Sequence, residues 1–231
     1  MRIVTLTFAC VCAVATAAPL FAQESSIADS RGFVTVSGGF ASALGQRTGD
    51  LLFEGGVSIA PHLKVVGDLG RFQNLQGDLQ ASLASTATSL ATNQGLGVTT
   101  ASSVPAWYGL GGLRYDVPLR PRVAPYVMGG IGVAHLNPQP QFLFASGALP
   151  DGSTPVIGSD VTSTITSAGL VTAPAASNGL LTSVGGGALL AVAPHLGVDV
   201  GYRFSRIAAG ATATGSALNT NGMTFGLSYR F

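Results

Sequence analysis

The sequence has 231 residues, of which only 9% are charged and 32 are glycine, and its formal net charge is +1. Ordinary soluble domains contain about 25% charged residues, so this composition is atypical of a soluble domain. The net charge is close to zero, and Arg120 and Arg122 form no larger basic cluster. The composition therefore excludes the electrostatic footprint of a nucleic-acid-binding protein, and we expect no nucleic-acid partner.

The chain begins with the features of a secretory signal peptide, which we assign to residues 1–22. Arg2 supplies a positive charge, an apolar stretch and small residues follow, and Leu20-Phe21-Ala22 before Gln23 fits a cleavage site. Cleavage after Ala17 or Ala18 fits the same pattern. This assignment predicts export of the chain out of the cytoplasm.

An uncleaved membrane anchor is the alternative for this segment. Its apolar run is, however, shorter than the about 20 residues that a spanning helix requires, and no long apolar run follows later in the chain. Both cysteines, Cys10 and Cys12, lie within the predicted signal peptide. We therefore expect the mature chain to have neither a disulfide nor a thiolate metal site.

After a periplasmic lead at 23–31, eight segments have the length and alternation of membrane-spanning strands, which need about 9–11 residues each. They are 32–41, 51–60, 63–72, 106–116, 125–136, 179–193, 196–207 and 222–231. A closed barrel is the main membrane option for such a chain, because lipid tolerates no unpaired strand edge. The pattern predicts an all-β fold, an eight-stranded antiparallel up-and-down transmembrane β-barrel that occupies residues 32–231.

The connections between these segments alternate in length. Short turns lie at Pro61-His62, at 117–124 and at Pro194-His195. The remaining connections are 42–50, 73–105, 137–178 and 208–221, of which 73–105 and 137–178 are long. In bacterial outer-membrane barrels the short turns face the periplasm and the long loops face outside. We therefore expect the outer membrane of a Gram-negative bacterium as the location, with extracellular loops at 73–105 and 137–178.

Both long loops contain segments with a regular pattern. In the first loop, Leu75, Leu79, Leu83 and Leu90 lie near helical spacing, so this loop contains either a short helix or irregular chain. In the second loop, residues 141–146 and 156–166 could extend a hairpin away from the membrane. If these two segments enter the membrane instead, the barrel has ten strands.

The last nine residues alternate strictly between apolar and polar side chains. Phe225, Leu227, Tyr229 and Phe231 share the apolar face, which would meet lipid in a membrane strand. This end resembles the C-terminal β-signal of Gram-negative outer-membrane proteins. The resemblance implies that the barrel-assembly machinery recognises these four side chains during biogenesis.

The strand count, the loop asymmetry, residues 124–132 (APYVMGGIG) and residues 228–231 (SYRF) resemble the family of small outer-membrane β-barrel domains. This family includes OmpA-like barrels with their OmpX-like and OmpW-like relatives. The resemblance covers nearly the whole mature chain and implies the architecture rather than an activity. OmpA-like proteins often carry a peptidoglycan-binding domain after the barrel, but here the last predicted strand is the last segment, so we do not expect cell-wall tethering.

Strand alternation also assigns the charged residues to the inside of the predicted barrel. The interior set is Glu54, Lys64, Asp68, Arg114, Asp116, Asp199, Arg203 and Arg230. It contains four acidic and four basic residues, as expected because an unpaired charge in a narrow interior is costly. These residues form either a salt-bridge network that fills the barrel or a polar pathway for ions and small solutes. The narrow interior of eight-stranded barrels favours the network.

No pattern of catalytic or ligand-binding residues accompanies the barrel. His135 lies near the outer end of its strand without a Ser-His-Asp arrangement beside it, so we interpret it as a hydrogen-bonded or solvated side chain. The glycine-rich stretches 109–112, 129–132 and 185–187 lack the Lys-Ser/Thr of a phosphate loop and indicate close packing instead. We expect no enzyme activity, no cofactor and no metal site.

These observations predict a structural or surface-interaction protein whose extracellular loops carry the contacts. A narrow porin-like channel is the alternative, and a lipid-modifying enzyme is a remote one. The expected partners are outer-membrane lipid and lipopolysaccharide, the barrel-assembly machinery and an unidentified surface ligand.

Overall fold

The computed structural model describes residues 30–75, 79–117, 119, 122–208 and 217–231. The predicted signal peptide at 1–22 and all but the last two residues of the lead at 23–31 lie outside the described residues.

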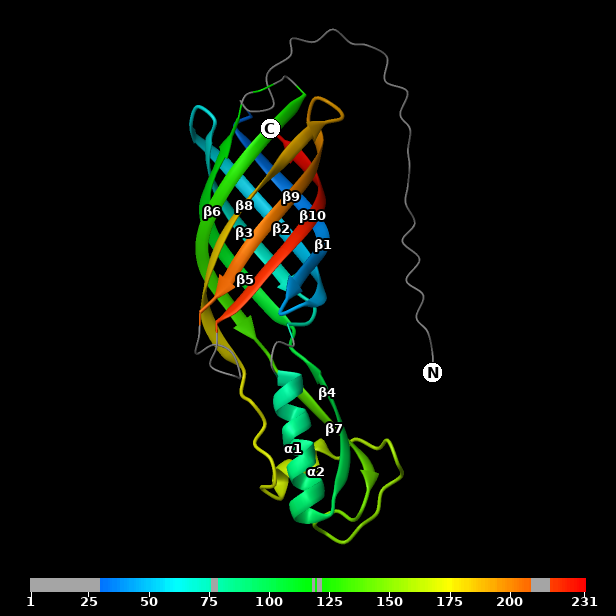
Figure 1. Cartoon of the computed structure of the whole chain (residues 1–231). Coiled ribbons are helices and arrows are strands. Elements are labelled where there is room, and N and C mark those ends of the chain that lie inside the picture. Colours follow the sequence, from blue (N-terminus) through cyan, green and yellow to red (C-terminus); the bar gives the residue numbers. More distant parts are fainter. Residues whose placement is uncertain (1–29, 76–78, 118, 120–121, 209–216) are drawn as a thin grey trace.

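The main body is a closed antiparallel barrel of eight strands (Figure 1). Its strands are β1 (Gly32–Ala43), β2 (Gln46–Ala60), β3 (Leu63–Phe72), β5 (Ala106–Asp116), β6 (Val123–Leu136), β8 (Ser177–Ala191), β9 (Leu196–Ile207) and β10 (Leu218–Arg230). Barrel strands that are consecutive in the sequence are neighbours in the wall, and β1 pairs with β10 to close the barrel. The predicted eight-stranded fold is confirmed.

The two-residue period of the strands produces a wall with two different faces. In β9 the apolar side chains from Leu196 to Phe204 point outward, whereas Asp199 and Ser205 are buried inside. The same alternation runs through β10 to the last residue, so that Phe225, Leu227 and Tyr229 of β10 and the following Phe231 are exposed on the outside. The exposed face is therefore an apolar belt of the kind that meets lipid.

The two ends of the described chain meet at one rim, which we call the terminal end. Gly32 and Phe231 exchange two backbone hydrogen bonds there, each with a nitrogen–oxygen distance of 3.0 Å. The opposite rim carries the long connections, and we call it the loop end. Phe231 thus belongs to the seam that closes the barrel.

A second body lies beyond the loop end of the barrel (Figure 1). It consists of α1 (Leu79–Gln94) and β4 (Gly97–Ser103) of the first long loop and β7 (Gln139–Ser146) and α2 (Thr162–Ser167) of the second, with the residues that connect the two elements within each loop. We call it the loop module. Its two strands form a separate antiparallel sheet, against which α1 packs. Neither of these two helices is long and apolar enough to cross a membrane.

The loop module corrects one prediction and decides another. The ten-stranded alternative is wrong, because β7 pairs with β4 of the other long loop outside the barrel. Residues 156–166 form one isolated bridge, between Leu143 and Asp160, and the start of α2 instead of a strand. The helix considered for the first loop exists as α1, and Leu79, Leu83 and Leu90 are its buried face.

The connection between β1 and β2 is much shorter than the predicted 42–50. The strands continue to Ala43 and from Gln46, so that only Leu44 and Gly45 form the turn. Both have positive φ angles, 48° and 82°, which is the conformation of a two-residue type I′ hairpin. The sequence concealed this turn because leucine seldom adopts a positive φ.

Candidate functional site

The structure places seven of the eight charges predicted for the interior in one connected cluster, the interior charge cluster. Its members are Glu54, Lys64, Asp68, Arg114, Asp116, Asp199 and Arg203. They come from β2, β3, β5 and β9, so the closed wall brings together residues that lie far apart in the sequence. Even the most exposed side chain, that of Arg203, is only 11% accessible.

Arg114 is the centre of this cluster. Its guanidinium donates to Asp116 Oδ1 at 2.8 Å and to Glu54 Oε1 at 3.1 Å, and lies 3.7 Å from Asp199 Oδ2. The same group stacks over the Tyr126 ring at 3.5 Å, a cation–π contact. Four partners therefore surround one buried cation, which offsets its loss of hydration.

Arg203 forms the second half of the cluster. It donates to Asp68 Oδ2 at 2.6 Å and to Glu54 Oε2 at 3.3 Å. Glu54 thus bridges the two arginines, and Asp116 bridges Arg114 to Lys64, whose ammonium lies 2.5 Å from Asp116 Oδ2. The charges alternate in sign along this chain of contacts, so no like charges are in direct contact along it.

Arg230 lies apart from the other seven residues. Its side chain donates to the carbonyl oxygens of Ala193 and Pro194, both at 3.3 Å, in the turn at the terminal end. Strand alternation correctly predicted the inward direction of Arg230, but it carried no information about depth along the barrel. We therefore assign Arg230 to the turn and not to the interior charge cluster.

Two tyrosines, Tyr108 and Tyr126, lie inside the barrel although the sequence did not predict an interior role for them. Tyr126 donates to Asp199 Oδ1 at 2.8 Å, and Tyr108 donates to Asp50 Oδ1 at 3.2 Å. Each ring occupies space that glycine leaves: a Cβ built on Gly70 would lie 2.2 Å from Tyr108 Cζ. Parity with the outward Val127 could have placed Tyr126 inside, but the surrounding glycines blur the alternation.

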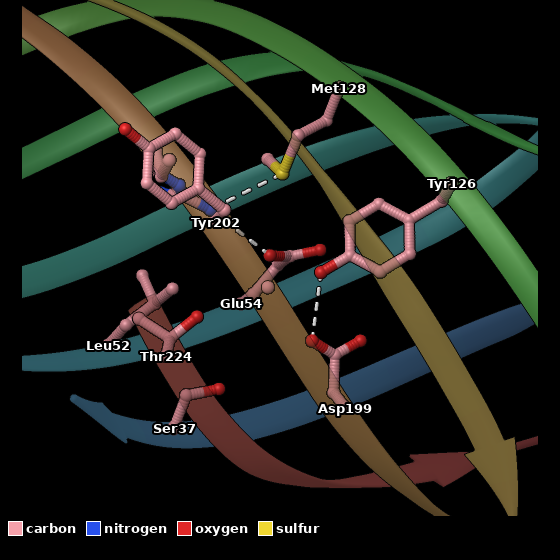
Figure 2. A pocket seen from close by; sticks show the side chains of 10 residues that line it. Ser37, Leu52, Glu54, Tyr126, Met128, Asp199, Tyr202 and Thr224 are labelled. Carbon is pink, nitrogen blue, oxygen red and sulfur yellow. Dashed lines mark hydrogen bonds and ion pairs between the residues drawn. The ribbon is translucent and has the colours of Figure 1, made fainter. Parts of the chain in front are cut away.

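The interior charge cluster borders a small cavity. A cavity of about 10 Å³ lies between Glu54, Tyr126, Asp199 and Arg203 (Figure 2). A cavity needs roughly 10–15 Å³ to hold one water molecule. The space is therefore of the size of a single water and far from that of a solute.

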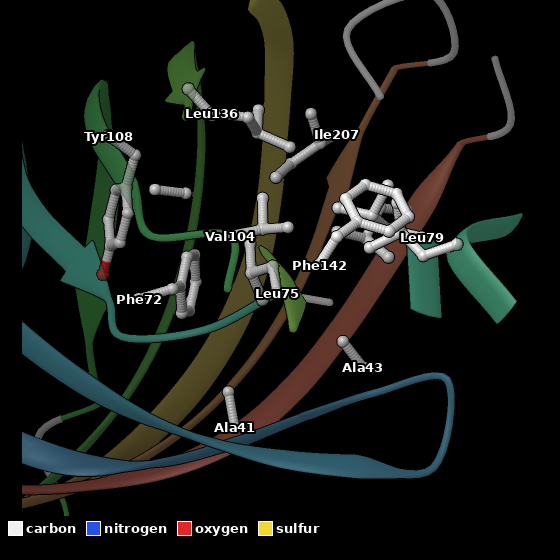
Figure 3. Close-up of a cluster of buried hydrophobic side chains, with 14 of the residues drawn as sticks. Ala41, Ala43, Phe72, Leu75, Leu79, Val104, Tyr108, Leu136, Phe142 and Ile207 are labelled. Atoms are coloured by element: carbon white, nitrogen blue, oxygen red, sulfur yellow. The ribbon is translucent and has the colours of Figure 1, made fainter. Parts of the chain in front are cut away.

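Toward the loop end the interior changes from charged to apolar (Figure 3). The buried cluster there includes Ala41, Leu52, Phe72, Tyr108, Leu110, Leu136, Leu181, Ile207 and Leu218 of the barrel, and Leu75, Leu79, Leu83, Leu90, Val104, Phe142, Phe144 and Ile165 of the loops and the loop module. The rings of Phe72 and Tyr108 stack with centroids 4.8 Å apart. One continuous apolar core, the junction core, therefore seals the loop end and joins the module to the barrel.

Backbone contacts reinforce this junction. Leu75 donates to the carbonyl of Val104 at 2.8 Å, and Val104 donates to Asn74 Oδ1 at 2.8 Å. Within the module, the backbone of Phe142 donates to Thr162 Oγ1 at 2.8 Å. Hydrogen bonds from Thr162 lower the pKa of the neighbouring Asp160 carboxyl. The module is thus an ordered extension of the barrel.

His135 points outward and not toward the interior. Its Nδ1 lies 2.7 Å from Asn178 Oδ1, so it is hydrogen-bonded, in agreement with the prediction. Its direct neighbour on the other side is Trp107 of β5. Among the described residues, no group of three or more His, Cys, Asp and Glu side chains is arranged to hold a metal ion.

The family model described as the outer membrane protein beta-barrel domain matches residues 7–231. The chain therefore belongs to this family and is an outer-membrane β-barrel protein. No curated protein matches the sequence significantly.

Solved structures share the fold at low sequence identity. Neisserial surface protein A is 15% identical over 87% of this chain and 96% of that chain, with a TM-score of 0.51. The Yersinia pestis attachment invasion locus protein Ail is 10% identical over 87% and 97%, with a TM-score of 0.45. The N-terminal barrel domain of Pseudomonas aeruginosa OprF is 8% identical over 87% and 99%, also with a TM-score of 0.45. At such identities the likeness concerns the fold alone.

Proposed function

We propose that this protein is a non-enzymatic outer-membrane anchor that presents its loop module at the cell surface for contact with an external ligand. The observation that carries this proposal is the junction core, which joins an ordered module to a barrel whose interior is already filled. Binding sites commonly lie on loops that a rigid scaffold positions. In this proposal the predicted signal peptide directs export, and the assembly machinery recognises Phe225, Leu227, Tyr229 and Phe231.

The surface of the module supports a contact role. Val156 and Ile157 are adjacent large apolar side chains, 79% and 76% exposed, in the segment that follows β7. The outer face of α1 carries serine and threonine hydroxyls, such as those of Ser85 and Thr92, and no charge. These two parts of the module surface, α1 and Val156-Ile157, suit an uncharged ligand better than a highly charged one.

The orientation can be tested with single cysteines, since Cys10 and Cys12 both lie in the predicted signal peptide. Thr154→Cys places a thiol on the module and Ala193→Cys places one in a turn at the terminal end. We expect a membrane-impermeant maleimide to label Thr154→Cys on intact cells and Ala193→Cys only after the outer membrane is permeabilised. The reverse pattern would contradict surface display, and the unsubstituted chain controls for background labelling.

The filled interior can be tested by conductance. We expect the purified chain to give no stable steps in a planar bilayer, because the interior charge cluster and the junction core block the axis at two levels. Conductance steps whose size changes in Glu54→Gln or Arg203→Gln would contradict the anchor proposal and identify a channel.

Enzyme activity is tested separately. Incubation with labelled lipid A and phospholipid should release no acyl chains, and release would identify an enzyme.

Assembly can be tested at the seam. Deleting Phe231 removes its two hydrogen bonds with Gly32 and the exposed aromatic side chain that follows β10. We expect a reduced yield of folded barrel in the outer membrane, scored by the heat-dependent shift on a gel. Phe231→Tyr, which keeps both the backbone and the ring, should assemble normally.

A further inference from the structure

The charged side chains exposed on the outside of the barrel are distributed unevenly. In the described barrel strands the exposed charged residues are Arg47, Arg71 and Arg206, all of them basic. Arg47 lies near the start of β2, and Arg71 and Arg206 near the ends of β3 and β9. All three therefore lie at the loop end, where the apolar belt meets the polar edge of the membrane.

One of these arginines belongs to a continuous row across four neighbouring strands. The strand register pairs Arg71 with Trp107, Trp107 with His135, and His135 with Asn178. All four side chains are exposed on the outer wall. Side chains directly opposite one another on antiparallel strands lie about 4.5–5.5 Å apart at Cβ, so the four can act on one bound group or on two adjacent ones.

Contacts within the row hold its polar groups in place. The Arg71 guanidinium carbon lies 5.1 Å from the centre of the Trp107 ring, and this cation–π contact keeps the charge against the wall. The Nδ1 atom of His135 lies 2.7 Å from Asn178 Oδ1, which fixes the imidazole. A guanidinium stacked in this way keeps its N–H edges free to donate, and arginine matches phosphate geometry with two parallel hydrogen bonds.

We propose that the row Arg71–Trp107–His135–Asn178 is a binding site for the phosphate of an anionic lipid headgroup at the loop end. Arg71 is the charged ligand, Trp107 lies against the boundary between acyl chains and headgroup, and His135 and Asn178 supply further polar contacts. The phosphate could belong to a phospholipid or to a phosphorylated glycolipid. The inference depends on the barrel lying in a membrane and is independent of what the loop module binds.

Trp107 is the only tryptophan of the chain, so its fluorescence reports on the row without a label. The full chain is folded into nanodiscs of phosphatidylcholine that contain increasing fractions of either phosphatidylglycerol or lipid A. We expect a saturable change in Trp107 emission with at least one of the two anionic lipids. In Arg71→Gln about tenfold more lipid should be needed, as expected for the loss of a charge-assisted hydrogen bond.

Arg31→Gln is the matched control, because it removes the same charge from an exposed residue next to β1 at the terminal end. It should titrate like the unsubstituted chain. A response to lipid A alone assigns the site to a glycolipid, a response to phosphatidylglycerol alone assigns it to a phospholipid, and either supports a phosphate site. An equal response in pure phosphatidylcholine, no response, or an unaltered titration in Arg71→Gln would overturn the proposal.

Substitution of Arg71 also changes the surroundings of Trp107, so a second variant and a second readout are needed. His135→Ala leaves the Arg71–Trp107 contact in place and should raise the lipid requirement by a smaller factor, about threefold. Native mass spectrometry of the folded protein with added lipid should show fewer retained anionic lipids in Arg71→Gln than in Arg31→Gln. Equal retention in the two variants would contradict the site.

Discussion

The two ends of the barrel interior are filled by opposite chemistry within the same wall. Toward the terminal end, Arg114 and Arg203 are paired with Glu54 and three aspartates in the interior charge cluster. Toward the loop end, the junction core contains leucine, phenylalanine and alanine and continues into the loop module. Buried ion pairs specify geometry, because each charge needs its partner, whereas an apolar core is set by volume and shape.

This comparison indicates a division of roles. The charged region is confined within the wall, where β2, β3, β5 and β9 supply all its side chains at a fixed register. The apolar region has no such boundary and recruits residues from the loops, such as Leu79 and Phe142. The barrel interior is therefore occupied by paired charges at one level and by a hydrophobic core at the next.

The largest effect is expected from Arg114→Ala. It leaves Glu54, Asp116 and Asp199 without their shared cation in a buried interior, and removing one partner of a buried ion pair costs about 3–5 kcal/mol. The free energy of unfolding in lipid vesicles, from urea titration of the gel shift, should fall by this amount. Arg206→Ala removes an exposed arginine and should change it by about 0.5 kcal/mol or less. Equal losses would mean that the cluster contributes no specific stability.

A smaller and local effect is expected from Leu83→Ala on α1. Deleting a buried leucine side chain costs about 2–5 kcal/mol, and here the cost should fall on the loop module. Limited proteolysis should cut α1 faster while the gel shift of the barrel stays unchanged. The exposed neighbour offers a control, since Ala84→Ser should leave proteolysis unaltered. A barrel that unfolds together with the module would show that the two form one cooperative unit.

An intermediate position between the two regions is occupied by Tyr108, whose ring lies in the junction core and whose hydroxyl donates to Asp50. Tyr108→Phe keeps the ring and removes the donor, which should cost about 1–2 kcal/mol in the urea titration. Adding Asp50→Asn should then cost less than it does in the unsubstituted chain. Strict additivity of the two changes would show that their hydrogen bond does not couple the regions.

The smallest effect is expected at the β1–β2 turn, which belongs to neither region. Leu44→Asn places a residue that tolerates a positive φ at this position and should raise stability by about 0.5–1 kcal/mol. Gly45→Ala should lower stability by a similar amount, since Gly45 has a φ of 82°. Shifts of the same sign in both variants would contradict the type I′ assignment.

The strands and the faces of their residues were predictable because both follow from local periodicity. Alternation directed Asp199 and Arg203 inward, and the structure places them there. The strand ends were less predictable: β2 begins at Gln46 and β10 at Leu218, before the predicted 51 and 222. The additional strand residues, 46–50 and 218–221, pair near the loop end. Many of them are polar, and polar residues there are compatible with either a strand or a loop.

The partners within the interior were not predictable. Alternation shows that a side chain points inward, but its depth depends on strand stagger, so Arg230 was grouped with charges that it does not contact. The pairing of β4 with β7 joins two loops that are separated by a whole hairpin of the barrel. No local pattern encodes that pairing, because it forms only once β5 and β6 bring the two loops to the same end.

The sequence by itself determined a membrane barrel of eight or ten strands with an apolar outside and a charge-balanced inside, since a two-residue period sends alternate side chains to opposite faces of the wall. The tertiary structure alone decided which charges meet, where the interior turns apolar, and that the loops fold into a module. It also placed Arg71, Trp107, His135 and Asn178 in one row. These features depend on strand register and closure, which bring distant residues within a few ångströms of each other.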